Sequence, residues 1–338
     1  MSFLYTAMEQ RKTDHIELAF SSRVADIYSD TRFSYEPLLG SLAQGEIKPF
    51  TFLGKTFRVP IWVSSMTGGS RFARHINTNL ARACREFGMG MGLGSCRILL
   101  EDKSCFDDFN VRDILGPDQP LYANIGIVQL EEMLEEGHVE RLEELVHSLR
   151  ADGLIIHVNP IQEWLQHEGQ ILKHPPIESI EQLLSQTKVK IIVKEVGQGM
   201  GPASISRLLK LPLEAIELAA FGGTNFAKVE LARGIPKNQE RYEPLTFVGH
   251  HALDMVESIN KYISSGEPLG CNQLIISGGI RSFLDGYYFI SKSQLPSIYG
   301  QASKLLHYAM EDYQSLESYL TDQINGLTFA RSFLRIRN

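Results

Sequence analysis

Short apolar runs alternate along the chain with amphipathic stretches of helix length. Each run ends in glycine or in polar residues, and a continuous apolar run is typical of a strand covered on both faces in a parallel sheet. The predicted strands are residues 60–66, 89–93, 121–125, 153–158, 190–196, 215–221, 274–277 and 297–300. Eight such strands, together with the groups that follow them, favour an α/β fold of the (β/α)₈ or TIM barrel type over an open doubly wound sheet.

Amphipathic stretches between these runs predict the helices of the barrel. They cover residues 73–87, 130–150, 180–186, 203–209 and 251–264. Gly88 and Gly266 follow two of them and are typical C-terminal stops. No linker rich in proline, glycine or serine divides the chain. We therefore expect one domain, in which residues 1–55 form an N-terminal arm or lid packed on a barrel of residues 56–338.

One strand exit carries four polar side chains with ligand or catalytic chemistry. The apolar run Leu154-Ile155-Ile156 is followed by His157 and Asn159, which face the same side of an extended chain. A proline then ends the strand, so Gln162 and Glu163 fall in the turn or at the start of the next helix. These groups either cap that helix or form one wall of a reaction site.

Composition and charge narrow the class of protein. The chain has 338 residues, 43% of them hydrophobic, and a formal net charge of -7. This balance argues against a nucleic-acid-binding protein and favours a small-molecule partner, around which Lys and Arg are concentrated locally. The four cysteines form no CxxC pair, and no run of about 18 apolar residues predicts a membrane span. We expect reduced thiols, no membrane partner and a cytoplasmic location.

Other predicted strands also end in chemically useful groups. Ser64 to Gly69 follow the first strand, Gly94-Ser95-Cys96-Arg97 the second, and Asn124 closes the third. Lys194 lies within the fifth strand, where a cation is costly unless it is paired or placed against an anion. In barrel enzymes the active site lies at the C-terminal ends of the strands. The sequence therefore predicts a shared pocket at that end.

Glycines follow the last strands of the predicted barrel. Gly222-Gly223 follows the sixth strand, Gly278-Gly279 the seventh, and Gly300 closes the eighth. Without a Cβ atom, such loops can bring backbone N–H groups onto phosphate oxygens. Each pair by itself also fits a tight turn. Together they favour a phosphate site in the last loops, as in many barrels.

In combination, these motifs resemble the type 2 isopentenyl-diphosphate isomerases. The matching segments are Arg11-Lys12 with His15, Ser65-Met66-Thr67-Gly68-Gly69, Gly94-Ser95, His157-Val158-Asn159-Pro160-Ile161-Gln162-Glu163, Lys194-Glu195-Val196-Gly197-Gln198-Gly199, Gly222-Gly223-Thr224-Asn225 and Ser277-Gly278-Gly279-Ile280-Arg281. They occur in the order found in that family and extend from Arg11 to about Ser303.

The resemblance implies an isomerase of isoprenoid biosynthesis that interconverts isopentenyl and dimethylallyl diphosphate. It also implies FMN, Mg²⁺ and NADPH, the last only to keep the flavin reduced. The reaction is a 1,3-allylic proton shift without net redox change. Reduced FMN suits it because N5 can exchange a proton and the electron-rich ring stabilises positive charge. The resemblance further implies a homo-oligomer, either a homotetramer or a homo-octamer.

Roles for individual residues follow from the same resemblance. The residues implied to contact FMN are Ser65, Met66, Thr67, Ser95, Asn124, Lys194, Thr224, Gly279, Arg281, Ala302 and Ser303. The residues implied to bind the diphosphate substrate are Arg11, Lys12, Ser95, Arg97, His157 and Asn159. Gln162 is implied to reach the hydrocarbon and place the proton, with His157 as a second catalytic residue. Glu163 is implied to be the protein ligand of Mg²⁺.

The sequence departs from the family at four places. Cys96 stands where the family has Gln, and its thiol is expected to pack rather than react. Residues 246–251 and 291–303 are poor matches, and the arm between residues 23 and 48 also diverges. Two other functions remain open: an FMN-dependent oxidoreductase of the 2-hydroxy-acid oxidase type, and a non-catalytic barrel that binds a phosphorylated ligand. The oxidase needs a His closely followed by Arg, and His250-His251-Ala252-Leu253 lacks that Arg.

Overall fold

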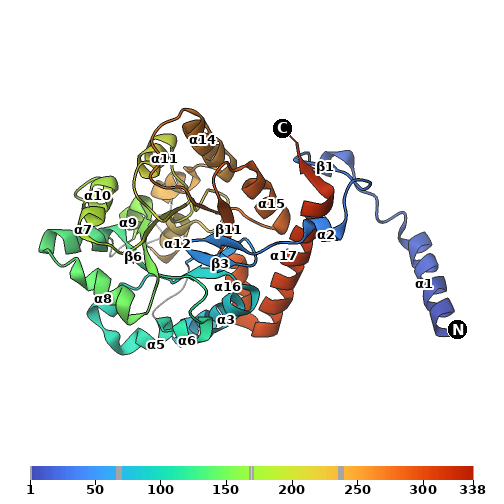
Figure 1. Ribbon diagram of the computed structural model, residues 1–338, viewed down its shortest axis with the longest axis horizontal. Helices are drawn as coiled ribbons and strands as arrows, with labels where there is room; N and C mark the ends of the chain where they lie inside the picture. Colours follow the sequence, from blue (N-terminus) through green and yellow to red (C-terminus); the bar gives the residue numbers. More distant parts are fainter. Residues whose placement is uncertain (1, 66–70, 167–168, 170, 235–239, 338) are drawn as a thin grey trace.

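Eight parallel strands close into a barrel at the centre of the molecule (Figure 1). The computed structural model describes residues 2–65, 71–166, 169, 171–234 and 240–337. The barrel strands are β4 Ile61–Val63, β5 Gly90–Gly92, β6 Leu121–Gly126, β7 Gly153–Val158, β8 Ile191–Glu195, β9 Ala215–Glu217, β10 Leu274–Ser277 and β11 Ser297–Gln301. Each lies within or beside a predicted run, so the predicted (β/α)₈ barrel is confirmed.

Helices surround the barrel on its outer face (Figure 1). The larger ones are α3 Arg71–Phe87, α7 Ile127–Glu136, α8 Glu140–Ser148, α10 Pro176–Gln186, α11 Pro202–Leu209, α14 Ala252–Ser264, α15 Phe283–Lys292, α16 Ser303–Glu311 and α17 Tyr313–Phe333. The shorter ones are α4 Ile98–Glu101, η2 Lys103–Cys105, α5 Phe106–Phe109, α6 Arg112–Leu115, α9 Pro160–Leu165, α12 Phe226–Arg233 and η3 Glu243–Phe247. In the described part of the chain, no helix is both long and apolar enough to cross a membrane.

The single helix predicted over residues 130–150 is wrong. Two helices, α7 and α8, occupy this region and are separated at Gly137. Gly137 has a φ of 74°, and its N–H donates to the carbonyl oxygens of Leu134 and Met133. This left-handed C-cap satisfies carbonyl groups at the helix end and turns the chain. The amphipathic pattern continued across the turn because both helices bury apolar side chains against the barrel.

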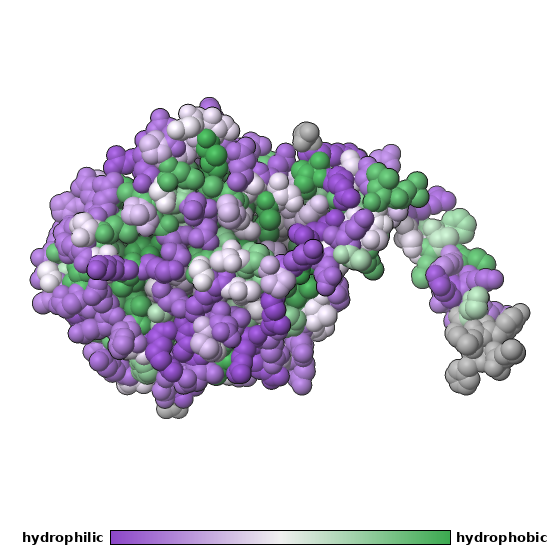
Figure 2. Space-filling view, viewed as in Figure 1, coloured by the Kyte–Doolittle hydropathy of each residue, from purple (hydrophilic) through white to green (hydrophobic). Residues whose placement is uncertain are grey.

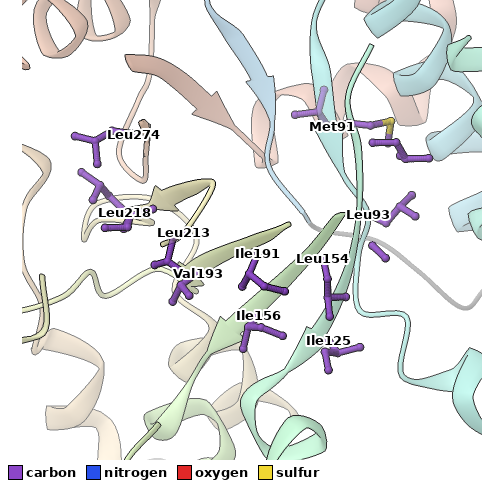
Figure 3. Close-up of a cluster of buried hydrophobic side chains, with 14 of the residues drawn as sticks. Met91, Leu93, Ile125, Leu154, Ile156, Ile191, Val193, Leu213, Leu218 and Leu274 are labelled. Carbon is purple, nitrogen blue, oxygen red and sulfur yellow. The ribbon is translucent and has the colours of Figure 1, made fainter. Parts of the chain in front are cut away.

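Two apolar layers stabilise the fold. Outward-facing strand residues such as Met91, Ile156 and Val193 pack against the helices in the cluster shown in Figure 3. Inside the barrel, Trp62 and Tyr122 lie edge to face, with ring centroids 6.1 Å apart. Full burial of an aliphatic side chain such as Ile156 stabilises the fold by about 1.5–3 kcal/mol.

A hairpin, β2 Phe50–Phe52 and β3 Lys55–Phe57, closes the barrel at the N-terminal ends of its strands. Phe52 and Phe57 are buried in the same interior cluster as Trp62. The backbone N–H of Leu53 donates to Gln273, directly before β10, over 2.8 Å. Since apolar side chains fill this end, polar chemistry inside the barrel is confined to the C-terminal end.

The N-terminal arm is attached to the C-terminal end of the chain. Strand β1 Phe33–Tyr35 pairs with β12 Leu334–Ile336, and α2 Leu42–Gly45 packs against α17. Before them come α1 Ser2–Leu18 and η1 Asp26–Tyr28. Helix α1 stands clear of the barrel, and hydrophobic side chains are exposed along the arm (Figures 1 and 2).

Candidate active site

The inner wall of the barrel changes from apolar to polar along the strands. Alternation along each strand points every second side chain inward. The first inward layer contains Trp62, Tyr122, Ile155, Ile192, Ala215, Ile275 and Ile298. One step nearer the C-terminal ends is a second layer, which we call the polar layer: Ser64, Asn124, His157, Lys194, Glu217 and Ser277. Chemistry-bearing side chains from five strands, and from the residue directly after β4, therefore share one end of the barrel.

A cavity of about 360 Å³ opens above the polar layer. Its walls come from two residues directly after β4, and from the ends of β8, β9, β10 and β11 and the loops that follow them. Of the predicted FMN-contacting residues, the structure brings together in this lining Ser65, Lys194, Thr224, Gly279, Arg281, Ala302 and Ser303. Asn124 lies in the polar layer and outside this lining, while Met66 and Thr67 lie outside the described residues.

Glycines shape the wall of the cavity after β9 and β10. Gly278 has a φ of 87°, and a Cβ atom there would lie 2.1 Å from the backbone N and O atoms of Ala220. Only glycine fits such a conformation and such a close approach. Gly279, with a φ of 72°, follows in the same turn. The N-terminus of α16 opens on the same cavity, with Ser303 and Lys304 in its lining. Backbone N–H groups, a helix N-terminus and a cation are a favourable environment for a phosphate.

Lys194 projects from β8 with only 6% of its surface exposed. Its Nζ donates to the carbonyl oxygen of Glu195 over 3.0 Å. Burial lowers the pKa of the ammonium, an effect that the nearby Glu217 and Glu195 oppose. The Glu195 carboxylate accepts instead from three backbone N–H groups of the following loop, so it orders that loop. In the described chain no carboxylate forms an ion pair with Lys194, and its side chain lines the cavity.

His157 lies next to Lys194 in the strand register. Its Nδ1 lies 2.9 Å from Asn124 Oδ1, and Asn124 Nδ2 donates to the carbonyl of Leu93. Because the amide of Asn124 is oriented by that second bond, its Oδ1 accepts and Nδ1 of His157 carries the hydrogen. Loss of hydration at this half-buried position, aided by the charge of Lys194, lowers the pKa of His157 far below its ordinary value. The imidazole is therefore neutral at pH 7.

The end of β7 and the start of α9 form a hydrogen-bonded group around Gln162. Asn159 Nδ2 lies 3.1 Å from both Gln162 Oε1 and Glu163 Oε1. Gln162 Nε2 donates over 3.0 Å to Glu230, a buried carboxylate on α12. Glu230 also accepts from Arg233 over 2.7 Å. The amide of Gln162 is thus held at both ends, and its orientation is fixed.

Glu163 faces a different hollow from the one beside Lys194. It lines this second space together with Trp164, which is 64% exposed, Ile171 and Tyr242. Among the described residues no three His, Cys, Asp or Glu side chains cluster as a metal cage. Glu163 therefore provides one carboxylate next to Asn159 and Gln162, at the edge of the site.

Several predicted substrate residues lie outside these groups. Ser95 and Arg97 are exposed after β5, where Arg97 Nε lies 3.7 Å from Glu101. Arg11 and Lys12 are exposed on α1, which projects away from the barrel (Figure 1). The structure does not bring these cations next to His157, and their predicted contact with a diphosphate stays a prediction.

Cys96 is buried in the apolar cluster outside the barrel, where its Sγ donates to the carbonyl of Gly94 over 3.4 Å. Burial raises the pKa of the thiol to about 12. A thiol that stays protonated at neutral pH is a poor nucleophile. The expectation that Cys96 packs rather than reacts fits this position.

Sequence reasoning missed three site residues. Glu217 lies in the polar layer, Lys304 lines the cavity at the start of α16, and Glu230 anchors Gln162. Glu217 carried a usable signal, since a carboxylate inside an apolar strand is costly unless it has a function. Glu230 carried none, because a glutamate in an amphipathic helix normally faces solvent.

Comparisons with known proteins give relatives along most of the chain, although no family model matches it. The chain is 34% identical over 321 residues to a protein of Rickettsia felis named isopentenyl-diphosphate delta-isomerase, covering 93% of the chain and 88% of the relative. A protein of the same name from Rickettsia akari is 35% identical over 302 residues, with coverage of 88% and 84%.

Solved structures with a similar fold include flavoproteins. A flavocytochrome b2 variant with sulfite bound has a TM-score of 0.60 at 15% identity, covering 89% of this chain and 72% of that one. A mandelate oxidase variant with an FMN adduct has a TM-score of 0.53 at 13% identity, with coverage of 90% and 88%. At such low identity these likenesses establish the barrel fold alone.

Proposed function

The chain belongs to the type 2 isopentenyl-diphosphate delta-isomerases, and from this premise we propose that it interconverts isopentenyl and dimethylallyl diphosphate with FMN as cofactor. The observation that carries the proposal is the position of Lys194. It lies beside the glycine-walled cavity and, one strand away, beside His157. A phosphate-binding cavity and the Asn159–Gln162–Glu163 group therefore meet at one end of the barrel.

The residues that line the cavity fit FMN. Its phosphate end is matched by Gly278, Gly279 and the N-terminus of α16. Its ring end is matched by polar groups without internal partners: in the described chain, Ser65 Oγ and Glu217 Oε2 are buried with no hydrogen bond. Such groups are costly unless a ligand completes them. Lys194 adds the cation that favours a reduced, anionic ring.

The allylic shift adds a proton at one end of a three-carbon unit and removes one from the other end, passing near a tertiary cation. When bound, reduced FMN supplies an electron-rich face and an exchangeable proton. Gln162 places the alkene, because Asn159 and Glu230 fix the direction of its amide. An amide is itself a weak acid and base, so its contribution is geometric. His157 and Asn159 hold the diphosphate end.

The decisive experiment is an assay of the purified chain with labelled isopentenyl diphosphate, FMN, Mg²⁺ and NADPH under anaerobic conditions. We expect dimethylallyl diphosphate to form, with no net consumption of NADPH after the flavin is reduced. Bound yellow flavin in the oxidised protein is the accompanying expectation. Absence of isomerisation from a protein that has bound reduced FMN would reject the proposed function.

Mg²⁺ fits the carboxylate of Glu163 next to a substrate diphosphate. This ion commonly uses one or two protein carboxylates and completes its shell with phosphate oxygens and water. Glu163→Gln is expected to raise the Mg²⁺ concentration for half-maximal activity about 10- to 100-fold, because a neutral amide is a weaker ligand. Titration of activity with Mg²⁺ measures the shift. The matched control is Glu135→Gln, which removes an exposed carboxylate paired with Lys173; equal Mg²⁺ curves for both variants would exclude Glu163 as the ligand.

His157 is expected to take up a proton when a diphosphate binds. In the free enzyme its imidazole is neutral and Nδ1 holds the hydrogen. Nε2 therefore has no hydrogen to donate to a phosphate oxygen, and the arriving anion raises the pKa of the ring. Calorimetric binding of inorganic diphosphate at pH 7, in buffers of different ionisation enthalpy, measures the uptake. His157→Gln is expected to abolish most of it, whereas His138→Gln, at an exposed ion pair with Glu140, leaves it unchanged.

The two other functions are less well supported. The similar oxidase structures share only 13–15% identity with the chain. His251 contacts the ring of Phe221 edge to face, and no arginine follows it closely in the chain. A non-catalytic phospholigand-binding barrel gives no reason for the anchored Gln162. Both alternatives predict no isomerisation in the assay above.

NADPH as reductant, a cytoplasmic location and a homo-oligomer complete the proposal. The four cysteines are free thiols, three of them buried, which suits a reducing compartment. The arm exposes large apolar side chains, including Phe20 and Leu38, that a second copy could cover. Sedimentation of the full chain would give the size of the assembly.

A further inference from the structure

Glu217 is a carboxylate in the floor of the cavity. It is the last residue of β9, is fully buried, and lines the cavity beside Lys194. Its Oε1 accepts hydrogen bonds from Ser64 Oγ, over 2.5 Å, and from Ser277 Oγ, over 3.0 Å. Ser277 ends β10, which is next to β9, and Ser64 directly follows β4, two strands further round the barrel. Both hydroxyls hold the same oxygen of the carboxylate.

The other oxygen of Glu217 is unused. Oε2 is buried and makes no hydrogen bond within the described chain. The indole N–H of Trp62, in the layer below, lowers the pKa of Glu217, but neither Trp62 Nε1 nor Glu217 Oε2 has a hydrogen-bond partner in the described chain. Burial raises the pKa of Glu217, while Lys194 and the two serine hydroxyls act in the opposite direction. A buried carboxylate oxygen without a hydrogen-bond partner destabilises the folded protein unless a ligand donates a hydrogen bond to it.

Lys194 and Glu217 together present a donor beside an acceptor. They are register partners on the adjacent strands β8 and β9, and in the described chain they form no direct ion pair. Adjacent strands lie about 4.8 Å apart, so both heads reach one small group in the cavity. The matching ligand edge has an acceptor next to a donor, as in the C2=O and N3–H groups of the flavin pyrimidine ring.

We propose that Glu217 is a cofactor-binding residue whose Oε2 accepts the flavin N3–H, while Lys194 donates to the neighbouring C2=O. The inference rests on the proposed FMN cofactor. Glu217 would therefore recognise a flavin ring whose N3 carries a hydrogen. The loops around the phosphate bind the other end of the cofactor. The contribution of Glu217 to affinity can therefore be measured separately from that of the phosphate site.

The test compares FMN with N3-methyl-FMN, which lacks the hydrogen, by quenching of flavin fluorescence on the full-length protein. In the unmodified protein the methyl group is expected to weaken binding about 10- to 100-fold. Glu217→Met keeps the side-chain length but removes the acceptor. This variant is expected to bind FMN about 10- to 100-fold more weakly and to discriminate less than about threefold between the two flavins.

Glu267→Met is the control variant, because it removes an exposed carboxylate that pairs with Lys210 and does not line the cavity. It is expected to retain the penalty for the methyl group. If Glu217→Met does not fold, Glu217→Gln is used; its neutral acceptor is expected to reduce the penalty at least about threefold. Equal affinity of the unmodified protein for both flavins, or an undiminished penalty in the Glu217 variants, overturns the assignment. A protein that binds no FMN at all would instead overturn the proposed function.

Discussion

Lys194→Met is expected to lower the rate of isomerisation about 10²- to 10³-fold. Lys194 is a buried cation without an ion-pair partner in the described chain, and it faces the cavity that fits FMN. Its charge acts in a water-poor site, where electrostatic stabilisation of a reduced ring is strong. Methionine fills a similar volume without that charge. The reduction potential of bound FMN is expected to fall by about 30 to 60 mV, from the loss of one charge-assisted hydrogen bond.

Single-turnover rates with pre-reduced enzyme and a spectroscopic redox titration measure these two effects. Lys210→Met is the matched control, since Lys210 is exposed and pairs with Glu267 on the outside of the barrel. It should change neither quantity. A Lys194→Met enzyme with an unchanged reduction potential would show that the lysine has a structural role only.

Gln162→Ala is expected to lower kcat about 10²- to 10³-fold, and Glu230→Ala nearly as much. The reason is that Glu230 fixes the amide that places the alkene, through the 3.0 Å bond from Gln162 Nε2. Residues that act as one unit give non-additive losses. The double variant should therefore be only slightly slower than Gln162→Ala alone.

The four members of this mutant cycle are compared by kcat and KM for isopentenyl diphosphate, and by thermal unfolding to confirm their folding. Glu181→Ala removes an exposed carboxylate paired with Arg207 and is expected to behave as the unmodified enzyme. Fully additive losses would mean that Glu230 does not act through Gln162, and the positioning role would have to be abandoned.

Strand positions were predictable because a strand buried on both faces requires a continuous run of apolar residues in the sequence. The run of Leu154 to Ile156 packs outward against helices at two positions and inward against Trp62 and Tyr122 at Ile155. Continuous apolar residues are the result, and β7 and β10 have the predicted bounds. The polar residues at the strand ends were visible for the same reason, since each interrupts an apolar run.

Helix α17 and the β2–β3 hairpin have no clear pattern in the local sequence. Helix α17 was not predicted, although it packs against α15, α16 and α2. Its apolar positions contact several elements in different directions, which weakens a simple amphipathic period. The β2–β3 hairpin was likewise read as part of the arm, because only the closed barrel turns Phe52 and Phe57 into interior residues.

The sequence by itself determined the barrel class, the end of the barrel that carries chemistry, and the family. These features depend on the local alternation of apolar and polar residues and on the order of motifs, both of which can be read from the linear sequence. The tertiary structure decided which groups act on one another: Glu217 and Lys194 became neighbours only through the register of β8 and β9, and Glu230 reached Gln162 across 68 positions of the chain. It also placed Arg11 and Lys12 on a helix away from the barrel. The distance between side chains that are far apart in the sequence depends on the closure of the sheet and on helix packing. Neither can be inferred from a single segment of the chain.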